Sequence, residues 1–186
     1  MRLVSLISGS GTTLQNLIDR QVADIVGVIA SKHGIAGIAR AASADIPCRV
    51  IEKTKGVTLE AYSEAVFAMI REWQPDLVCL CGWLKLLTIP ADFERRVLNI
   101  HPSLLPKFGG HGMYGHHVHE AVLAAGETES GCTVHYADNT YDTGPIMVQK
   151  KVPVLVGDTP ETLARRVFEA ECEAYPEAIA KWQRKV

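Results

Sequence analysis

The stretch Asn99-Ile100-His101-Pro102 combines residue types that could do chemistry at neutral pH. An asparagine amide can donate a hydrogen bond to a developing negative charge, and an imidazole exchanges a proton near neutral pH. The apolar run from Val97 to Ile100 predicts the end of a buried strand, and Pro102 favours an extended His101. Open α/β sheets build their sites where such strands end, so we predict a functional site here. The alternative is a structural loop with a buried, hydrogen-bonded histidine.

A second polar segment, residues 139–145 (Asn-Thr-Tyr-Asp-Thr-Gly-Pro), lies between two predicted late strands. Asp142 precedes Thr-Gly-Pro, so a turn is expected, and an aspartate that only shapes this turn is the simpler interpretation. If the fold returns the loop to His101, the carboxylate would stabilise the imidazolium and raise the histidine pKa. We therefore expect Asp142 beside His101.

The glycine-rich residues 8–13 (Ser-Gly-Ser-Gly-Thr-Thr) follow the first predicted strand and precede a helix. Backbone amides at a helix N-terminus attract phosphate, and glycines let a ligand approach closely. The segment lacks both the Gly-Lys-Ser/Thr ending of a P-loop and the third glycine of the dinucleotide fingerprint, so we predict a monophosphate ligand. The alternative is a tight turn in which Thr12 or Thr13 caps the helix.

A histidine-rich stretch follows the candidate site and comprises His111, His116, His117 and His119. Their irregular spacing matches no usual zinc pattern, so we expect no metal site and instead a loop or helix face near the substrate. Lys107 could hold an anionic substrate or could be a solvated loop lysine.

Short apolar runs alternate with amphipathic segments throughout the chain. The predicted strands are 3–7, 24–30, 48–51, 77–81, 97–100, 131–136 and 146–154. The predicted helices are 12–20, 34–44, 58–72, 115–125 and 159–185, with a bend near Pro176. The alternation predicts a three-layer, doubly wound α/β fold, a mostly parallel sheet with helices on both faces. The late strand pair has room for an antiparallel member. A length of 186 residues favours one domain, residues 1–186.

Composition narrows the class of protein. Hydrophobic residues make up 47% of the chain and charged residues 22%, which is ordinary for a globular protein. A net charge of -2 gives no electrostatic case for a nucleic acid or an anionic membrane. The five cysteines match no zinc spacing and are typical of a reduced, cytoplasmic protein. The N-terminus predicts a first strand rather than a signal peptide, and no apolar run reaches the roughly 20 residues of a membrane span.

Taken together, these motifs resemble the phosphoribosylglycinamide formyltransferases of purine synthesis, over essentially the whole chain. The resemblance is strongest at residues 99–107, 142–145 and 149–154, and the opening residues 7–15 fit as well. The Asn-x-His and Asp-x-Gly-Pro pair is shared by a wider group of folate-dependent formyl-handling enzymes. The glycine-rich opening points to the branch that acts on glycinamide ribonucleotide.

The resemblance implies transfer of a formyl group from 10-formyltetrahydrofolate to the glycyl amine of the ribonucleotide. Asn99 and protonated His101 would stabilise the oxyanion, while Asp142 would hold His101 and move protons through water. No metal or covalent intermediate is required.

The resemblance also implies which residues bind substrates. The ribonucleotide would contact Gly11, Thr12, Thr13, Lys107 and Glu171, with Glu171 at the ribose hydroxyls or, alternatively, a solvated helix charge. The folate would contact Leu84, Lys85, Leu86, Leu87, Asn99, Thr140, Tyr141 and Asp142. Residues 108–119 form a longer stretch than the common family form, and Leu59 and Lys85 stand where arginines are usual.

Two rival functions remain open. One is another enzyme that handles 10-formyltetrahydrofolate, either a hydrolase or a formyltransferase for a different amine. The other is a non-catalytic phosphate-binding module. In each case we expect small-molecule partners, no nucleic acid or membrane, and a monomer or weak homodimer.

Overall fold

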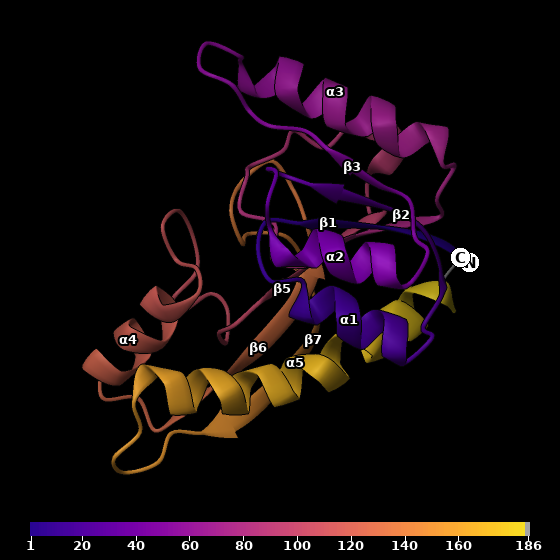
Figure 1. Ribbon diagram of the computed structural model, residues 1–186. Coiled ribbons are helices and arrows are strands. Elements are labelled where there is room, and N and C mark those ends of the chain that lie inside the picture. The colour runs from indigo at the N-terminus through magenta and orange to yellow at the C-terminus, as the bar shows by residue number, and fades with distance from the viewer. Residues whose placement is uncertain (185–186) are drawn as a thin grey trace. The chain divides into compact units, whose positions relative to one another are not determined.

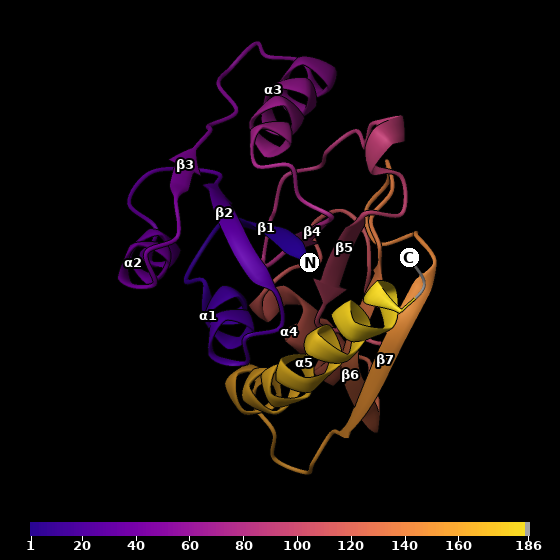
Figure 2. The ribbon, with the colours of Figure 1, turned by 90° about the vertical axis from the view of Figure 1, so that its right-hand side faces the viewer.

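The computed structural model describes residues 1–184. The chain divides into two compact units, Met1–Asn99 and Ile100–Val186. Figures 1 and 2 show the elements of each unit from two directions. No helix among the described residues has both the length and the apolar character needed to cross a membrane.

The first unit alternates strands and helices. Its elements are β1 (Arg2–Ile7), α1 (Thr12–Asp19), β2 (Asp24–Ala30), α2 (Ala36–Ser43), β3 (Cys48–Val50), α3 (Leu59–Glu72), β4 (Leu77–Leu80), the short 3-10 helix η1 (Ala91–Phe93) and β5 (Val97–His101), whose last two residues belong to the second unit. The strands lie in the order β3-β2-β1-β4-β5 and are parallel. Helices α1 and α2 cover one face and α3 covers the other (Figures 1 and 2). The expected α/β class, mostly parallel with helices on both faces, is confirmed.

Apolar strands explain this arrangement. Residues 3–7 of β1 are buried throughout, as expected for a central strand of a parallel sheet covered on both faces. Helix α3 presents Tyr62, Val66 and Ile70 as one buried stripe, and the Thr58 hydroxyl caps its start by accepting from the Ala61 N–H at 3.2 Å.

The start of α1 differs from the expected hydroxyl cap. The cap residue is Gly11 in a left-handed conformation (φ 73°), and no side chain caps the helix. A Cβ at Gly11 would lie 2.6 Å from the Gly37 Cα, so glycine is needed for both the backbone conformation and the close approach of α2. The prediction that Thr12 or Thr13 caps α1 is therefore wrong, although the helix does begin at Thr12.

The second unit contains α4 (His116–Ala124), β6 (Glu129–Tyr136), β7 (Ile146–Pro153) and α5 (Pro160–Gln183). Strands β6 and β7 form the expected antiparallel pair, with a register shift between Val134 and His135. Helix α5 packs on both strands and on α4. It starts with a capping box of Thr159 and Thr162 and contains Pro176; the expected helical residue 185 lies outside the described part of the chain.

Candidate active site

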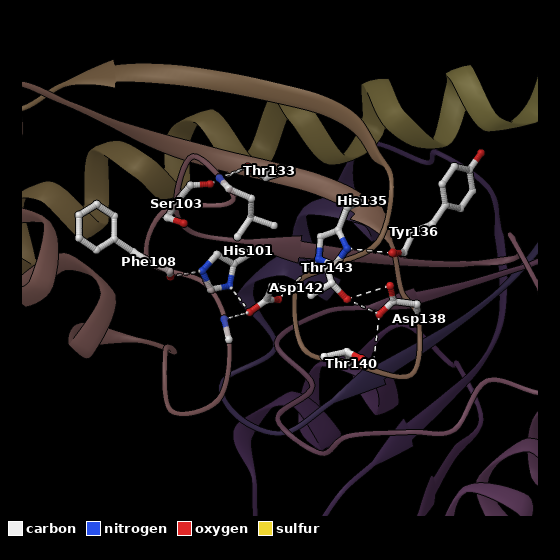
Figure 3. A network of polar contacts seen from close by, with 12 residues as sticks. His101, Ser103, Phe108, Thr133, His135, Tyr136, Asp138, Thr140, Asp142 and Thr143 are labelled. Atoms are coloured by element: carbon white, nitrogen blue, oxygen red, sulfur yellow. Dashed lines mark hydrogen bonds and ion pairs between the residues drawn. The ribbon is translucent and has the colours of Figure 1, made fainter.

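The second unit brings His101 and Asp142 together. His101 ends β5, and the loop between β6 and β7 returns Asp142 to it, so that Nδ1 of His101 lies 3.5 Å from Oδ2 of Asp142 (Figure 3). Both side chains are buried, with 5% and 8% of their surface exposed. Asn99 lies two residues before His101 on the same strand, and strand alternation places both side chains on one face.

A second imidazole, from His135 near the end of β6, approaches the same carboxylate. Its Nε2 lies 3.6 Å from Oδ1 of Asp142, and its Nδ1 lies 2.9 Å from the Tyr136 carbonyl oxygen. His135 lies in the predicted strand 131–136, and its sequence context predicted no role for it. The available clue was a histidine in the strand that leads directly into the Asp142 loop.

Backbone groups of residues 108–110 cover the His101–Asp142 pair. His101 Nε2 donates to the Phe108 carbonyl at 2.8 Å, and the Gly110 N–H donates to Asp142 Oδ2 at 2.9 Å (Figure 3). A Cβ at Gly109 would lie 3.2 Å from the Asp142 Cβ, so a larger residue would crowd the carboxylate. The main chain thus occupies one hydrogen-bonding position on the His101 ring and one on the Asp142 carboxylate.

The loop that holds Asp142 is organised by Asp138. Its carboxylate accepts from the Thr140 N–H at 3.0 Å and from the Thr143 hydroxyl at 2.9 Å. Asp142 itself is left-handed (φ 59°), a conformation that aspartate tolerates better than most residues. Gly144 comes two residues later, and a Cβ at this position would lie 1.8 Å from the Tyr136 carbonyl oxygen. One loop therefore contains both the predicted turn and the Asp142 carboxylate that approaches His101.

Hydrogen bonds also fix the segment after His101. The Thr133 hydroxyl of β6 donates to the Ser103 carbonyl at 2.7 Å and accepts from the Leu105 N–H at 3.1 Å. Gln149 of β7 donates to the Thr133 hydroxyl at 3.0 Å and to the Leu105 carbonyl at 2.9 Å. Residues 103–105 are thus attached to the β6–β7 pair.

Burial and charge compete for the pKa of both partners. Burial lowers the pKa of His101 and outweighs the opposing effect of Asp142. Burial acts to raise the pKa of Asp142, but the hydrogen bond from His135, the charge of His101 and the Gly110 N–H outweigh it, so this pKa is lowered. The expectation of a raised His101 pKa is wrong, because it counted the neighbouring charge and not the loss of solvent. At neutral pH the geometry favours an ionised Asp142 and a neutral His101 with its proton on Nε2.

The other predicted residues of the second unit have varied environments. Lys107 is largely exposed and pairs with Glu127 at 2.7 Å. Thr140 is exposed, while the half-buried Tyr141 contacts the His111 ring edge-on. Burial raises the pKa of Glu171 on α5 to about 7, which does not fit a freely solvated helix charge.

The first unit holds the glycine-rich loop in place. The Gly37 N–H donates to the Gly9 carbonyl at 3.1 Å, and the Arg40 guanidinium donates to the Ser10 carbonyl at 2.9 Å. Gly11 is buried, Thr12 is exposed and Thr13 is half-buried. The loop therefore presents the N-terminus of α1 beside a guanidinium, an arrangement that suits an anion.

The segment after β4 is irregular and joins this loop. The Leu84 N–H donates to the Ser8 hydroxyl at 3.0 Å. Leu84 and Lys85 are exposed, Leu86 is half-buried and Leu87 is buried. Leu87 is a core residue, so only its backbone could face a ligand.

The histidine cluster does not gather around one point. His116 and His117 are exposed and lie near glutamates, whereas His119 is buried on α4. Residues 1–184 contain no group of three or more His, Cys, Asp or Glu side chains arranged to hold a metal ion.

Comparison with known proteins assigns the family. Residues 1–179 match the family described as Formyl transferase. The chain belongs to the formyl transferase family. Among solved formyl transferases, it is 41% identical to phosphoribosylglycinamide formyltransferase from Brucella melitensis, over 97% of this chain and 94% of that one, with a TM-score of 0.87. For the Bacillus halodurans enzyme the identity is 33%, the coverage 97% and 94%, and the TM-score 0.89. These matches confirm the resemblance inferred from the motifs.

Curated relatives are longer than this formyl transferase chain. The trifunctional purine biosynthetic protein adenosine-3 of Drosophila pseudoobscura pseudoobscura is 44% identical, and the match covers 96% of this chain but 13% of the relative. The chloroplastic phosphoribosylglycinamide formyltransferase of Arabidopsis thaliana is 38% identical, with coverage of 96% and 64%. The chain thus spans less than two thirds of the length of both.

Proposed function

We propose that this formyl transferase moves the formyl group of 10-formyltetrahydrofolate to the glycyl amine of phosphoribosylglycinamide, a step of de novo purine synthesis. The observation that carries the proposal is the buried pair of His101 and Asp142. Asn99 lies on the same strand as His101, two residues before it. It occurs in a chain 41% identical to a phosphoribosylglycinamide formyltransferase over 94% of that enzyme's length.

The proposed chemistry begins when the amine attacks the formyl carbon and negative charge develops on the formyl oxygen. Asn99 and the Nε2–H of His101 would donate to this oxygen, and one well-aimed donor contributes roughly 3 kcal/mol. Nε2–H is the group that donates to the Phe108 carbonyl in this structure. The formyl oxygen therefore replaces that carbonyl as acceptor, and His101 donates as a neutral imidazole.

Asp142 supports the proton transfers. The new C–N bond leaves a surplus proton on the glycyl nitrogen, and breaking the bond to the folate nitrogen requires a proton there. An ionised carboxylate accepts the first proton, through water, and returns it to the departing nitrogen. The lowered pKa of Asp142 supports this role, because the group is ionised before the reaction begins.

The binding roles are proposals for each unit separately. In the first unit, Gly11, Thr12 and Thr13 would hold the phosphate through backbone amides, and residues 84–87 would contact the folate through their backbone. In the second unit, Glu171 would bind the ribose hydroxyls, Lys107 would assist with the anionic substrate, and Thr140 and Tyr141 would contact the folate. The glycine loop beside Arg40 supports the phosphate assignment.

We also propose that residues 1–186 act as one formyltransferase domain in the cytoplasm, as a monomer or weak homodimer with small-molecule partners. The family match over residues 1–179 supports the single domain. The free thiols of all five cysteines support a reducing compartment.

The test is an isotope-transfer assay with a stable carbon label in the formyl group of 10-formyltetrahydrofolate. Labelled formyl-ribonucleotide is expected only when both substrates are present. Labelled formate without labelled ribonucleotide would instead indicate a hydrolase. Binding of the ribonucleotide with no consumption of the folate would indicate a phosphate-binding module.

A further inference from the structure

His135 and His101 face one carboxylate from opposite sides. Nε2 of His135 lies 3.6 Å from Oδ1 of Asp142, and Nδ1 of His101 lies 3.5 Å from Oδ2 (Figure 3). The second nitrogen of each ring lies within hydrogen-bond distance of a backbone carbonyl, Tyr136 for His135 and Phe108 for His101. A carbonyl oxygen only accepts, so each ring must carry a proton on that second nitrogen.

The contact between His135 and Asp142 stabilises the ionised carboxylate. Nδ1 of His135 is committed to the Tyr136 carbonyl, so Nε2 is the ring atom that faces Oδ1. The contact with His135 lowers the pKa of Asp142, and few solvent dipoles weaken such a contact in a buried site.

The fold holds His135 in this orientation. Its side chain is buried within β6, with 2% of its surface exposed. The β6–β7 register shifts between Val134 and His135, and such bulges redirect side chains next to functional sites. Gly144 leaves space for the Tyr136 carbonyl, since a Cβ there would lie 1.8 Å from that oxygen.

We propose that His135 is a positioning residue, whose Nε2 fixes Oδ1 of Asp142 and so keeps Oδ2 facing His101. This role rests on the proposed function, because it acts through Asp142. The described groups that surround the carboxylate are His135 from β6, His101 from β5 and the Gly110 N–H, and the buried His119 of α4 interacts with His101 in turn. His135 therefore supplies one of the donors that keep Asp142 ionised in a buried site.

The matched variants are His135→Gln and His135→Asn. Both replace the imidazole with a neutral amide, but the glutamine amide reaches the position of Nε2, next to Asp142, whereas the asparagine amide reaches only that of Nδ1, next to the Tyr136 carbonyl. We expect His135→Asn to lower kcat by about 10–100-fold, the usual effect of losing a partner that orients a functional group. The KM for the ribonucleotide should stay within about twofold, since His135 touches no proposed substrate group.

The pH profile separates positioning from a structural role. Without the His135 donor the pKa of Asp142 rises, so the acidic limb of the kcat profile of His135→Asn should move to higher pH. His135→Gln should restore both kcat and the wild-type position of the acidic limb. Equal losses in both variants with an unchanged profile would overturn the proposal. So would wild-type kcat and an unchanged profile in His135→Asn.

A measurement on histidine-labelled protein without substrate tests the contact directly. The ring-nitrogen NMR resonances of His135 should shift in Asp142→Asn, because Nε2 loses the charged carboxylate that it faces. Unchanged His135 resonances would overturn the proposal even if the isotope assay succeeds. If the isotope assay fails while the resonances shift, the proposed function is wrong and the contact itself stands.

Discussion

At the scale of single residues, main-chain groups complete the environment of the candidate catalytic side chains. The carbonyls of Phe108 and Tyr136 each accept from an imidazole, and the Gly110 N–H donates to Asp142. Main-chain groups cannot be removed by mutation, so the side chains themselves are the accessible test of this chemistry.

We predict that His101→Ala and Asp142→Asn each lower turnover about a hundredfold or more, the range typical of groups that stabilise charge or transfer protons. His101→Ala removes the Nε2 donor, and Asp142→Asn keeps the shape of the side chain but abolishes its ability to accept a proton. Steady-state kinetics with saturating ribonucleotide and folate measures the effect.

The matched control is His117→Ala, which removes an exposed imidazole of α4 that lies near Glu120 and is assigned no role. It should retain wild-type turnover. Wild-type rates in both His101→Ala and Asp142→Asn would show that the candidate site is wrong.

At the scale of elements, helix α4 buries an ionisable group. His119 is 4% exposed, and among the described residues its Nδ1 has no hydrogen-bond partner. Burial, with the charges of His116 and His101, lowers the pKa of His119 from 6.5 to about 4. Protonation of the folded chain at this position is therefore unfavourable.

We predict that the contribution of His119 to the free energy of unfolding falls as the pH is lowered. Between the unfolded pKa of 6.5 and the folded pKa of about 4, the unfolded state binds a proton at His119 that the folded state does not. The stabilising contribution of neutral His119 is therefore fully present above pH 6.5, and it decreases as the pH falls towards about 4. From about pH 8 to about pH 5 this contribution falls by about 2 kcal/mol. Urea titrations of the wild type and of a variant that lacks His119, at both pH values, measure it.

The variant His119→Leu removes the titrating group. Between about pH 8 and about pH 5 its free energy of unfolding should therefore fall by about 2 kcal/mol less than that of the wild type. His101 contributes in the same direction, because its pKa is also lowered, and Glu171 contributes in the opposite direction, because burial raises its pKa, so the variant keeps some pH dependence. His117→Ala serves as the control and should behave as the wild type. An unchanged pH dependence in His119→Leu would show that His119 is not the source.

The sequence predicted the elements better than their junctions. Periodicity identified the strands and helices because it reports which residues are buried, and the antiparallel β6–β7 pair returned Asp142 to His101 as expected. The glycine cap of α1 depends on a close approach to Gly37 that no local pattern encodes. The role of residues 108–110 depends on a loop conformation, and the direction of the His101 pKa depends on burial, which spacing alone does not give.

At the scale of the whole molecule, substrate binding and folding are linked. A ligand that binds only the folded state raises stability, by about 2.7 kcal/mol at a hundred times its dissociation constant. For a chain of this size, 1 kcal/mol raises Tm by roughly 2–4 °C, so the ribonucleotide at that concentration should raise Tm by roughly 5–10 °C. Thermal denaturation with and without ligand measures the shift.

The matched ligand for this test is glycinamide riboside, which lacks only the phosphate. The glycine loop holds the N-terminus of α1 beside Arg40, so most of the recognition proposed for Gly11, Thr12 and Thr13 depends on that phosphate. At the same concentration the riboside should therefore produce a much smaller shift. Equal shifts from both ligands would mean that the loop does not bind the phosphate, because the remaining groups of the substrate would then account for all of the affinity.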